Sequence, residues 1–410
     1  MKFITEINFS ISKHNPGTQH LVQVAVPFGE RVLVDSSYIR LFSNNSSIPC
    51  SSTTTQNWPD GSVKWLMIEF SSKHVSESIK KLSVFIDTFI DEKKKNVLSY
   101  KKVDECIYIS HPSYQIEIQQ DNGLLKINGN DPVEILPEVQ INERLIALSC
   151  ISPTKIIEDS DKLIAHLKMQ GAHEYSNLKV EWQFIIRSEF DAIESKVLIH
   201  NTNAAKHPNG LWDLGDDNST CIDFFRLRIR TQTPNGSLIL DNKEYNPDEK
   251  LKLIQHSSGG ENWQSSSHVI ADGTIPMKLA GYELFIDNLE LIGSRATPKI
   301  SLHQNNIDIV VEQFWQNFPS AIEFNEDGCT IELLAEVNYC HELQGGEKKS
   351  YTLWIGNKGK LPVSDIKIRG AVTQSYLSST SATFLIGSNN NSPDEIAPII
   401  KLGLDGANNF

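Results

Sequence analysis

The stretch QHSSGGENWQSSSH, residues 255–268, collects side chains that can transfer protons and recognise a sugar. His256 and His268 can each accept or donate a proton near neutral pH, and the carboxyl group of Glu261 can do the same. Trp263 offers a flat apolar face of the kind that stacks on sugar rings, and the Gly-Gly pair lets the backbone approach another group closely. We predict either a catalytic loop built from these residues or a long connection that Trp263 anchors to the fold.

A second polar stretch, HNTNAAKHPNGLWDLGDDNS at residues 200–219, lies between two expected strands. Because loops carry functional residues more often than strands do, His207 and Trp212 are candidates for contact with a substrate. Asp213 and Asp216 supply carboxylate oxygens of the kind that a hard cation such as calcium prefers, although the spacing does not match an EF-hand. The alternative to a calcium site is a structural turn that is capped by aspartates and stabilises the long loop.

A third candidate segment is YCHELQGGEKKSYTLWIG, residues 339–356, where His341 precedes a Gly-Gly turn and a strand. This pattern predicts a hairpin with a polar lip, in which His341 either contacts substrate or belongs to the architecture of the turn. The run FRLRIR adds Arg226 and Arg228, which alternate with apolar residues. Such alternation is typical of a half-buried strand, so we expect both arginines on its outer, basic face.

Composition excludes several classes of partner. The chain has 410 residues and a formal net charge of −13, with an isoelectric point near 5.4. This charge argues against nucleic acid and against an anionic membrane surface as partners. No apolar run approaches the roughly 18 residues that a membrane-spanning helix needs, and the N-terminus lacks the apolar region of a secretory signal. We therefore expect a cytoplasmic location for the chain as written, or an extracellular one if it is a processed fragment.

Familiar catalytic motifs are absent from the sequence. It contains no G-x-S-x-G, no phosphate-binding GxxxxGK[ST], no HExxH and no dinucleotide fingerprint, which disfavours serine hydrolases, nucleotide triphosphatases, zinc proteases and dehydrogenases. The six cysteines lie far apart, without a CxxC pair or a Cys/His ligand pattern. We predict free, buried thiols in preference to a disulfide or a metal site.

The residues that could do chemistry must be positioned by strands, because short period-2 apolar runs recur along the chain without clear helical periodicity. In NWPDGSVKWLMIEF, residues 57–70, Pro59 and Gly61 predict a tight turn that leads into a buried strand. Trp58 and Trp65 flank this turn as core residues, as a sugar platform, or as both. The short strand spacing of the first part favours a small closed barrel or a sandwich that ends near residue 95.

The second part also reads as β-structure. A mixed-charge segment at residues 91–105 predicts a linker, and the Asn-Gly pair in YQIEIQQDNGLLKING predicts a β-hairpin directly after it. Further short strands continue to about residue 356, which indicates a large antiparallel β-sandwich. The Ser- and Asn-rich remainder is too short to form a domain.

Six motifs, in order, resemble the exo-rhamnogalacturonan lyase family and its YetA-like relatives: VAVPFGERVLVD, NWPDGSVKWLMIEF, GLWDLGDDNS, QHSSGGENWQSSSH, EQFWQNFPSAIEF and HELQGGEKKSYTLWI. The resemblance covers roughly residues 20–356. It implies a RIFT-type β-barrel over residues 1–95 and a central β-sandwich over residues 104–365, an all-β fold in which both tryptophans of the WPDG turn are structural. The family continues into a C-terminal α/α toroid, for which residues 366–410 are too short, so we expect a terminal extension or the stump of a missing domain.

The resemblance implies β-elimination on polysaccharide that contains uronic acid, such as rhamnogalacturonan in pectin. This reaction needs a base for the C5 proton, a positive group that neutralises the neighbouring carboxylate, and an acid for the departing oxygen. His256, His268 and Glu261 are the catalytic candidates. The neutralising charge is assigned to Arg226 or Arg228, or to a cation such as calcium on Asp213 and Asp216. The remaining substrate contacts are Trp263, Trp212, His207 and His341.

A protein that only binds carbohydrate or assists assembly is the alternative to a lyase. It would keep barrel and sandwich without the helical domain. Polar loops such as residues 200–219 and 256–268 favour a working cleft, because a purely structural sandwich has little need for them.

Overall fold

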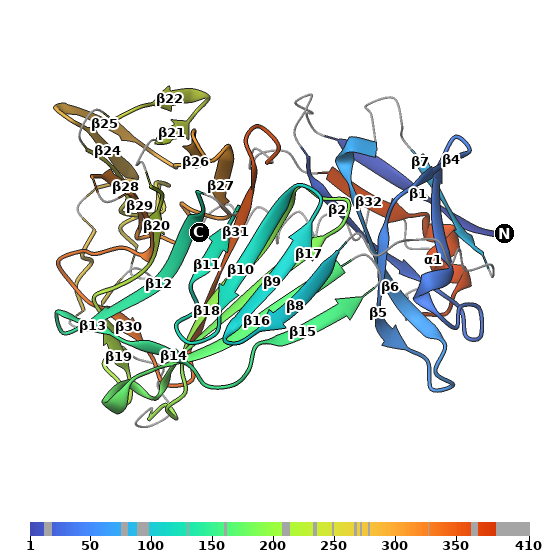
Figure 1. The fold of residues 1–410 in the computed structure, drawn as a ribbon, viewed down its shortest axis with the longest axis horizontal. Coiled ribbons are helices and arrows are strands. Elements are labelled where there is room, and N and C mark those ends of the chain that lie inside the picture. Colours follow the sequence, from blue (N-terminus) through green and yellow to red (C-terminus); the bar gives the residue numbers. More distant parts are fainter. Residues whose placement is uncertain are drawn as a thin grey trace.

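The computed structural model of the chain describes residues 1–11, 19–74, 81–87, 98–128, 131–159, 162–206, 214–232, 236–247, 250–265, 269–270, 273–277, 279–326, 328–361 and 368–382. These ranges consist mainly of antiparallel β-strands, and helical turns are few and short. The helical elements of the described ranges are η1 (Ser36–Tyr38), η2 (Ser72–His74), η3 (His173–Tyr175) and α1 (Gln374–Ser379). The all-β prediction is thereby confirmed (Figure 1). No helix in the described ranges has the length and apolar character needed to cross a membrane.

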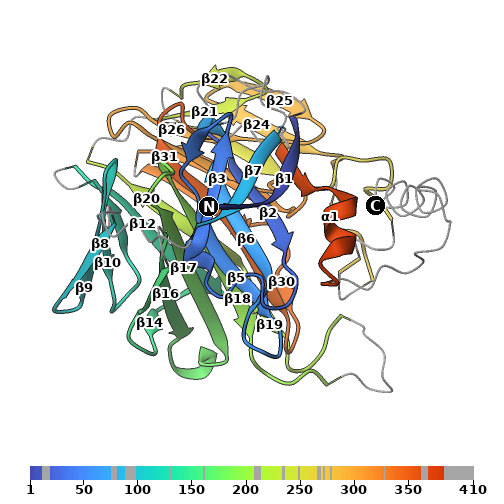
Figure 2. The same cartoon turned by 90° about the vertical axis from the view of Figure 1, so that its right-hand side faces the viewer.

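The first unit of the chain contains two packed sheets, whose strands from the N-terminal part of the chain are seen in blue in Figure 2. One has the order β32-β1-β7-β3-β4, with bounds Ile368–Val372, Lys2–Ile11, Lys81–Ile86, Ile39–Ser43 and Ser46–Ile48. The other has the order β2-β6-β5, with bounds Leu21–Pro27, Val63–Ser71 and Ser51–Asn57. Apolar side chains of both sheets share one core. The described strands of this unit stay in two open sheets, so the closed barrel expected from the sequence is not formed by them.

The second unit is built on two large sheets. The twelve-stranded sheet of the described residues has the order β25-β24-β23-β28-β29-β20-β12-β11-β10-β9-β8, with β13 beside β12. The bounds in that order are Leu289–Gly293, Tyr282–Ile286, Leu251–Gln255, Ser320–Asn325, Gly328–Leu334, Phe224–Arg230, Val133–Ile141, Leu125–Ile127, Tyr114–Gln119, Cys106–His111, Ser99–Val103 and, for β13, Arg144–Ile146.

The partner sheet, ten-stranded within the described ranges, has the order β14-β16-β17-β18-β31-β27-β26-β21-β22, with β15 beside β16. Its bounds are Leu148–Cys150, Lys162–Gly171, Leu178–Arg187, Ala192–Asn201, Lys348–Asn357, Ile307–Val311, Lys299–Leu302, Gly236–Leu240, Lys243–Tyr245 and, for β15, Lys155–Asp159. Alternate residues of both large sheets point inward and form one extended apolar core. Trp182 lies fully buried in it, and its indole N–H donates to the Ser195 hydroxyl at 2.7 Å. The large antiparallel sandwich predicted from the sequence is therefore confirmed.

The WPDG turn forms as its residue types predict. The Gly61 N–H donates to the carbonyl of Trp58, and the Asp60 carboxylate accepts from both the backbone and the hydroxyl of Ser62. The Trp58 indole N–H donates to the Phe28 carbonyl at 3.0 Å, and the Lys64 ammonium lies 4.6 Å from the Trp58 ring centre. Trp58 is thus tied into the first unit by its own hydrogen bond, as expected of a structural tryptophan.

Two segments form strands where the sequence predicted a linker and a terminal extension. Ser99–Val103, expected within a linker, forms β8, an exposed edge strand of the twelve-stranded sheet. Ile368–Val372, expected in a terminal extension, pairs as β32 with β1. The Tyr376 hydroxyl then donates to the Pro27 carbonyl at 2.7 Å. The chain therefore returns to its first unit after it has completed the sandwich, because the open edge of β1 offers unpaired backbone groups.

A disulfide corrects the prediction that all cysteines are free thiols. Cys221 and Cys340 are joined, with their Cα atoms 5.4 Å apart and a separation of 119 positions in the sequence. Cys221 lies in β19 (Thr220–Ile222), which pairs with β30 (His341–Leu343). The pairing of these two short strands brings the thiols together, and neither the spacing nor the neighbours of the cysteines signal it. Cys50, Cys106, Cys150 and Cys329 remain thiols.

Candidate functional site

The segment after β23 is held on a fixed path by buried polar side chains. Gln255 is fully buried. Its amide nitrogen donates to the carbonyls of Ser257 at 2.7 Å and Ser294 at 2.9 Å, and its oxygen accepts from the Ala296 N–H at 2.9 Å. The Ser257 hydroxyl accepts from the Gly281 N–H at 2.9 Å. Three stretches are thus tied together, and we call them the β23 junction: residues 255–263, 279–283 and 293–296.

Two glycines of this junction allow neighbouring backbone segments to lie in close contact. Gly259 has a φ of +65°, and a Cβ atom there would collide with the Ser294 carbonyl. Gly281 has a φ of +114° and lies against the backbone of Gly293. A side chain at either glycine would push these backbones apart. The close contact that the Gly-Gly pair predicts is therefore, at Gly259, a contact with the protein's own backbone.

His256 lies at the start of the junction and contacts a carboxylate that sequence reasoning missed. Its Nε2 lies 2.6 Å from Oε2 of Glu283, and about a quarter of each side chain is exposed. Glu283 comes from β24, the neighbouring strand, and the His256 N–H donates to the Gly281 carbonyl at 2.8 Å. Because the Glu283 carboxylate accepts a hydrogen bond from Nε2–H, Nδ1 is left as the basic nitrogen of the neutral ring. The pair has the arrangement of a general base and its orienting group.

A cation also lies at this junction. The Arg295 guanidinium donates through Nε to the Ser258 carbonyl at 3.0 Å and lies 4.1 Å from the ring centre of Trp315. Ser258 is only two residues beyond His256, so the cation and the His256–Glu283 pair belong to one loop cluster. In the described part of the chain, no carboxylate lies within ion-pair distance of Arg295. The junction therefore combines a base, a cation and an aromatic face.

The other residues predicted for this loop are placed as follows. Trp263 is half-buried at the end of a turn in which its N–H donates to the Gly260 carbonyl at 3.3 Å, and Glu261 is exposed on the same turn. His268 lies outside the described residues. Trp263 and Glu261 are therefore on the surface side of the junction, in reach of solvent.

Arg226 and Arg228 do face outward from β20, but both are already bound to a carboxylate. Arg226 Nε lies 2.9 Å from Glu138 Oε2, and Arg228 Nη2 lies 2.6 Å from Glu138 Oε1. The Arg226 guanidinium also stacks on Phe224, 4.1 Å from its ring centre. The path from β23 to β20 runs through β28 and β29, a separation of about 14 Å at the usual strand spacing. These arginines therefore do not share one reacting centre with His256.

Glu332 is a buried acid on the same outer face of the sheet. It lies opposite Arg226 in the pairing of β29 with β20, and it is 3% exposed. Its Oε2 accepts from the Glu336 N–H at 3.1 Å. Burial raises the pKa of Glu332, which the neighbouring Lys252 charge only partly offsets. A carboxyl group of this kind can hold a proton at a higher pH than an exposed glutamate.

The loop predicted as a calcium site is described only in part. His207, Trp212 and Asp213 lie outside the described residues. Asp216 caps two backbone N–H groups, that of Lys206 at 2.6 Å and that of Asn218 at 2.8 Å. Within the described ranges, no group of three or more His, Cys, Asp or Glu side chains is arranged to hold a metal ion. The contacts of Asp216 are those of a capped turn.

His341 is buried in the fold rather than open to a ligand. It is 7% exposed, and its Nε2 lies 2.6 Å from the Ala335 carbonyl. Burial lowers the pKa of His341 to about 4. The ring is therefore neutral at pH 7 and donates a hydrogen bond to the backbone, an architectural role at the base of the β19–β30 ribbon.

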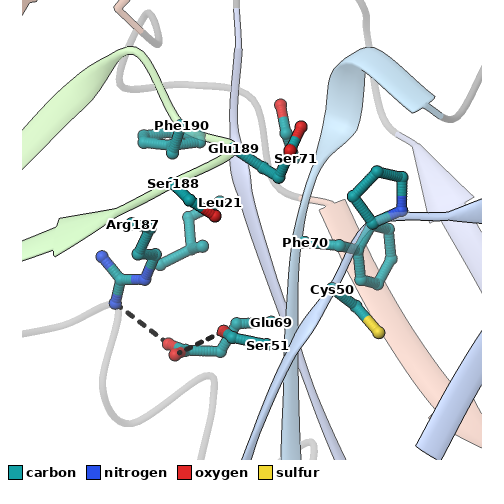
Figure 3. Close-up of a pocket in the computed structure, with 11 residues that line it drawn as sticks. Leu21, Cys50, Ser51, Glu69, Phe70, Ser71, Arg187, Ser188, Glu189 and Phe190 are labelled. Carbon is teal, nitrogen blue, oxygen red and sulfur yellow. Dashed lines mark hydrogen bonds and ion pairs between the residues drawn. The ribbon is translucent and has the colours of Figure 1, made fainter. Parts of the chain in front are cut away.

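A pocket lies at the seam between the two units (Figure 3). Strands β2, β5 and β6 contribute one wall, and the turn after β17 contributes the other. Its lining includes Leu21, Ser51, Glu69, Phe70, Arg187 and Phe190. None of the residues selected from the sequence lines it.

Charged groups of both units meet under this pocket. Glu69 of β6 is 4% exposed; its two oxygens accept from Arg187 Nη2 and from Lys162 Nζ, each at 3.0 Å. Arg187 Nη2 also donates to Glu194 at 2.7 Å. Burial by itself raises the pKa of Glu69, but the positive Arg187 and Lys162 outweigh it and lower this pKa to about 2. The two units are thus joined by a buried ion-pair network, which we call the seam network: Glu69, Lys162, Arg187 and Glu194.

We predict that Gln255→Leu lowers the free energy of unfolding by about 2–3 kcal/mol, because it leaves buried backbone groups of the junction without partners. Urea denaturation followed by circular dichroism measures the change. The matched control is Gln115→Leu, an exposed amide on β10, for which we expect a change within about 0.5 kcal/mol. Equal effects of both substitutions would contradict a role of Gln255 in holding the junction.

No family model matches the chain, and no curated protein matches it. Among solved structures it is similar to a galactose mutarotase related enzyme from Lactobacillus acidophilus, with 9% identity, a TM-score of 0.32, and coverage of 63% of this chain and 98% of that one. An alpha-mannosidase from Enterococcus faecalis V583 matches with 10% identity and a TM-score of 0.44 over 92% of this chain, but over only 44% of the enzyme. The galactosidase domain of an alpha-galactosidase-sucrose kinase matches with 10% identity, a TM-score of 0.34, and coverage of 69% and 43%. The names of these neighbours refer to sugars, and the resemblance to rhamnogalacturonan lyases stays a prediction.

Proposed function

We propose that this chain binds carbohydrate that contains uronic acid and cleaves it by β-elimination at the β23 junction. The observation that carries the proposal is the 2.6 Å contact between His256 and Glu283. A histidine whose one nitrogen is held by a carboxylate presents the other nitrogen as a base in a defined direction. Seven residues further along the same segment, Trp263 offers a half-buried aromatic face for a sugar ring.

In the proposed reaction, His256 Nδ1 takes the C5 proton of the uronate. The electrons of the C5–H bond form the C4–C5 double bond, and the C4–O bond to the next sugar breaks. The imidazolium that has formed returns its proton to the departing oxygen, so that protons and electrons balance. Glu283 stabilises the imidazolium between these two transfers, because a nearby negative charge favours the charged form of histidine.

The test is an elimination assay on rhamnogalacturonan and other polyuronides, with and without calcium, followed by the ultraviolet absorbance of the unsaturated product. We expect His256→Ala to lower the rate by about a hundredfold or more, the effect typical of a lost general base. His166→Ala is the matched control, because His166 Nε2 lies 2.9 Å from Glu181 in a pair of similar exposure on the other large sheet. We expect this control to keep the wild-type rate.

Binding without cleavage is the second candidate, and the outer face of β20 favours it. Arg226 and Arg228 both form ion pairs with Glu138. Neither arginine is therefore free to neutralise the uronate carboxylate, which elimination requires and simple binding does not. A wild-type chain that binds polyuronide but yields no unsaturated product would refute the lyase proposal and support this alternative.

A further inference from the structure

Two arginines of the described chain stack on an aromatic ring in the same way. The Arg226 guanidinium lies 4.1 Å from the ring centre of Phe224, and the Arg295 guanidinium lies 4.1 Å from that of Trp315. Stacking of this kind fixes the plane of the guanidinium and leaves its N–H groups directed sideways. The two sites are therefore comparable in how the cation is held.

They differ in what the cation binds. Arg226 and its neighbour Arg228 share the carboxylate of Glu138, at 2.9 and 2.6 Å. Arg295 uses Nε on the Ser258 carbonyl at 3.0 Å, and no acidic side chain of the described ranges comes within ion-pair distance of it. Its two terminal nitrogens keep the donor geometry that matches a carboxylate. The position that Glu138 has beside Arg226 is not taken by a described residue beside Arg295.

The surroundings of Arg295 suit a ligand better than an internal partner. Arg295 is exposed, Trp315 is half-buried, and Gly260 packs against the guanidinium, where a Cβ atom would lie 2.9 Å from Nη2. The orientation of the cation is thus set before a ligand arrives, which lowers the entropic cost of binding. The aromatic face of Trp315 and the turn of Trp263 flank the same junction.

We propose that Arg295 and Trp315 form a subsite that binds the carboxylate of a uronic acid and so selects uronates over neutral sugars. The inference deepens the proposed function, on which it rests for the kind of substrate. Arg295 Nη1 and Nη2 donate to the two carboxylate oxygens, and Trp315 supports the guanidinium from behind. This subsite supplies the positive charge for which Arg226 and Arg228 were candidates from the sequence.

The test is ligand-observed NMR titration of the full chain with D-galacturonate and with D-galactose, which differ at C6. We expect galacturonate to bind at least tenfold more tightly than galactose, and this ratio to fall as salt is added. Arg295→Ala removes the preference, Arg295→Lys keeps part of it because the charge remains without the bidentate geometry, and Trp315→Ala weakens galacturonate binding several-fold. The matched control is Arg144→Ala, an exposed arginine on β13, which keeps the wild-type ratio.

Two outcomes would overturn the subsite: equal affinity of the wild-type chain for both sugars, or an unchanged preference in Arg295→Ala. The behaviour of Arg295→Lys separates the subsite from a general folding defect, because that variant keeps the positive charge and a long side chain at this position. The readout is also independent of catalysis. A preference for galacturonate without unsaturated product would refute the lyase activity and leave the subsite standing.

Discussion

Glu69→Gln is expected to lower the free energy of unfolding by about 3–5 kcal/mol, the cost of removing one partner from a buried ion pair. Lys162 and Arg187 both use the Glu69 carboxylate, and after the substitution only Glu194 remains to balance them within the seam network. Because these residues come from different units, we expect the junction between the units to fail first. Equilibrium urea denaturation, followed by circular dichroism and by limited proteolysis at the seam, measures both effects.

The control for this prediction is Glu6→Gln. Glu6 forms a 2.8 Å ion pair with Lys81, but this pair lies at the surface, with 39% of the Glu6 side chain and 62% of the Lys81 side chain exposed. Exposed pairs contribute about 0–1 kcal/mol, so this variant should remain close to wild type. If both substitutions cost the same, burial is not what makes the seam network important, and the prediction is wrong.

Acid should weaken the same network. The folded pKa of Glu69 is about 2, below its ordinary value of 4.5, so the unfolded chain binds this proton first as pH falls. The stabilisation from Glu69 is therefore fully present above about pH 4.5 and is lost as pH falls from there towards 2, a change of about 3 kcal/mol. Glu69→Gln removes the group that titrates. Its stability should accordingly depend less steeply on pH over this interval than that of the wild-type chain.

Loss of the Cys221–Cys340 disulfide is expected to lower the free energy of unfolding by about 4 kcal/mol. The bond joins residues 119 apart, and the chain-entropy argument gives a large effect for such a long loop because the cross-link restricts the unfolded chain. Urea denaturation of Cys221→Ser, and of wild type with and without dithiothreitol, measures the change. A wild-type transition that does not respond to the reductant would contradict it.

Cys106→Ser is the matched control for the disulfide, because Cys106 is a half-buried thiol on β9. We expect it to unfold like wild type in the absence of reductant. The disulfide also has a local consequence. It ties β19 to β30 beside Glu342, whose Oε1 accepts from the Gly215 N–H and from the Ser219 hydroxyl, each at 2.7 Å. Reduction should therefore expose the 214–219 loop to proteases before the sandwich core unfolds.

The sequence by itself determined the class of the fold and much of its local structure. Period-2 alternation put Leu227 and Ile229 inside and Arg226 and Arg228 outside, as the burial of β20 confirms. Pro59 and Gly61 predicted the turn before β6, and the Asn-Gly pair predicted the hairpin of β10 and β11. These features depend on backbone preferences and on burial of one strand face, which act over a few residues and are therefore readable along the chain.

Only the tertiary structure decided which side chains meet. Glu283, Arg295 and Trp315 stand 27, 39 and 59 residues after His256, and nothing in their local sequence marks them as its neighbours. The order of strands in the sheet keeps Arg226 apart from His256 and brings Glu283 beside it. Cys221 and Cys340, and Glu69 and Arg187, are joined across still longer separations. Such contacts are set by strand order and register, which local sequence patterns leave open because each strand can pair with many others of the same alternation.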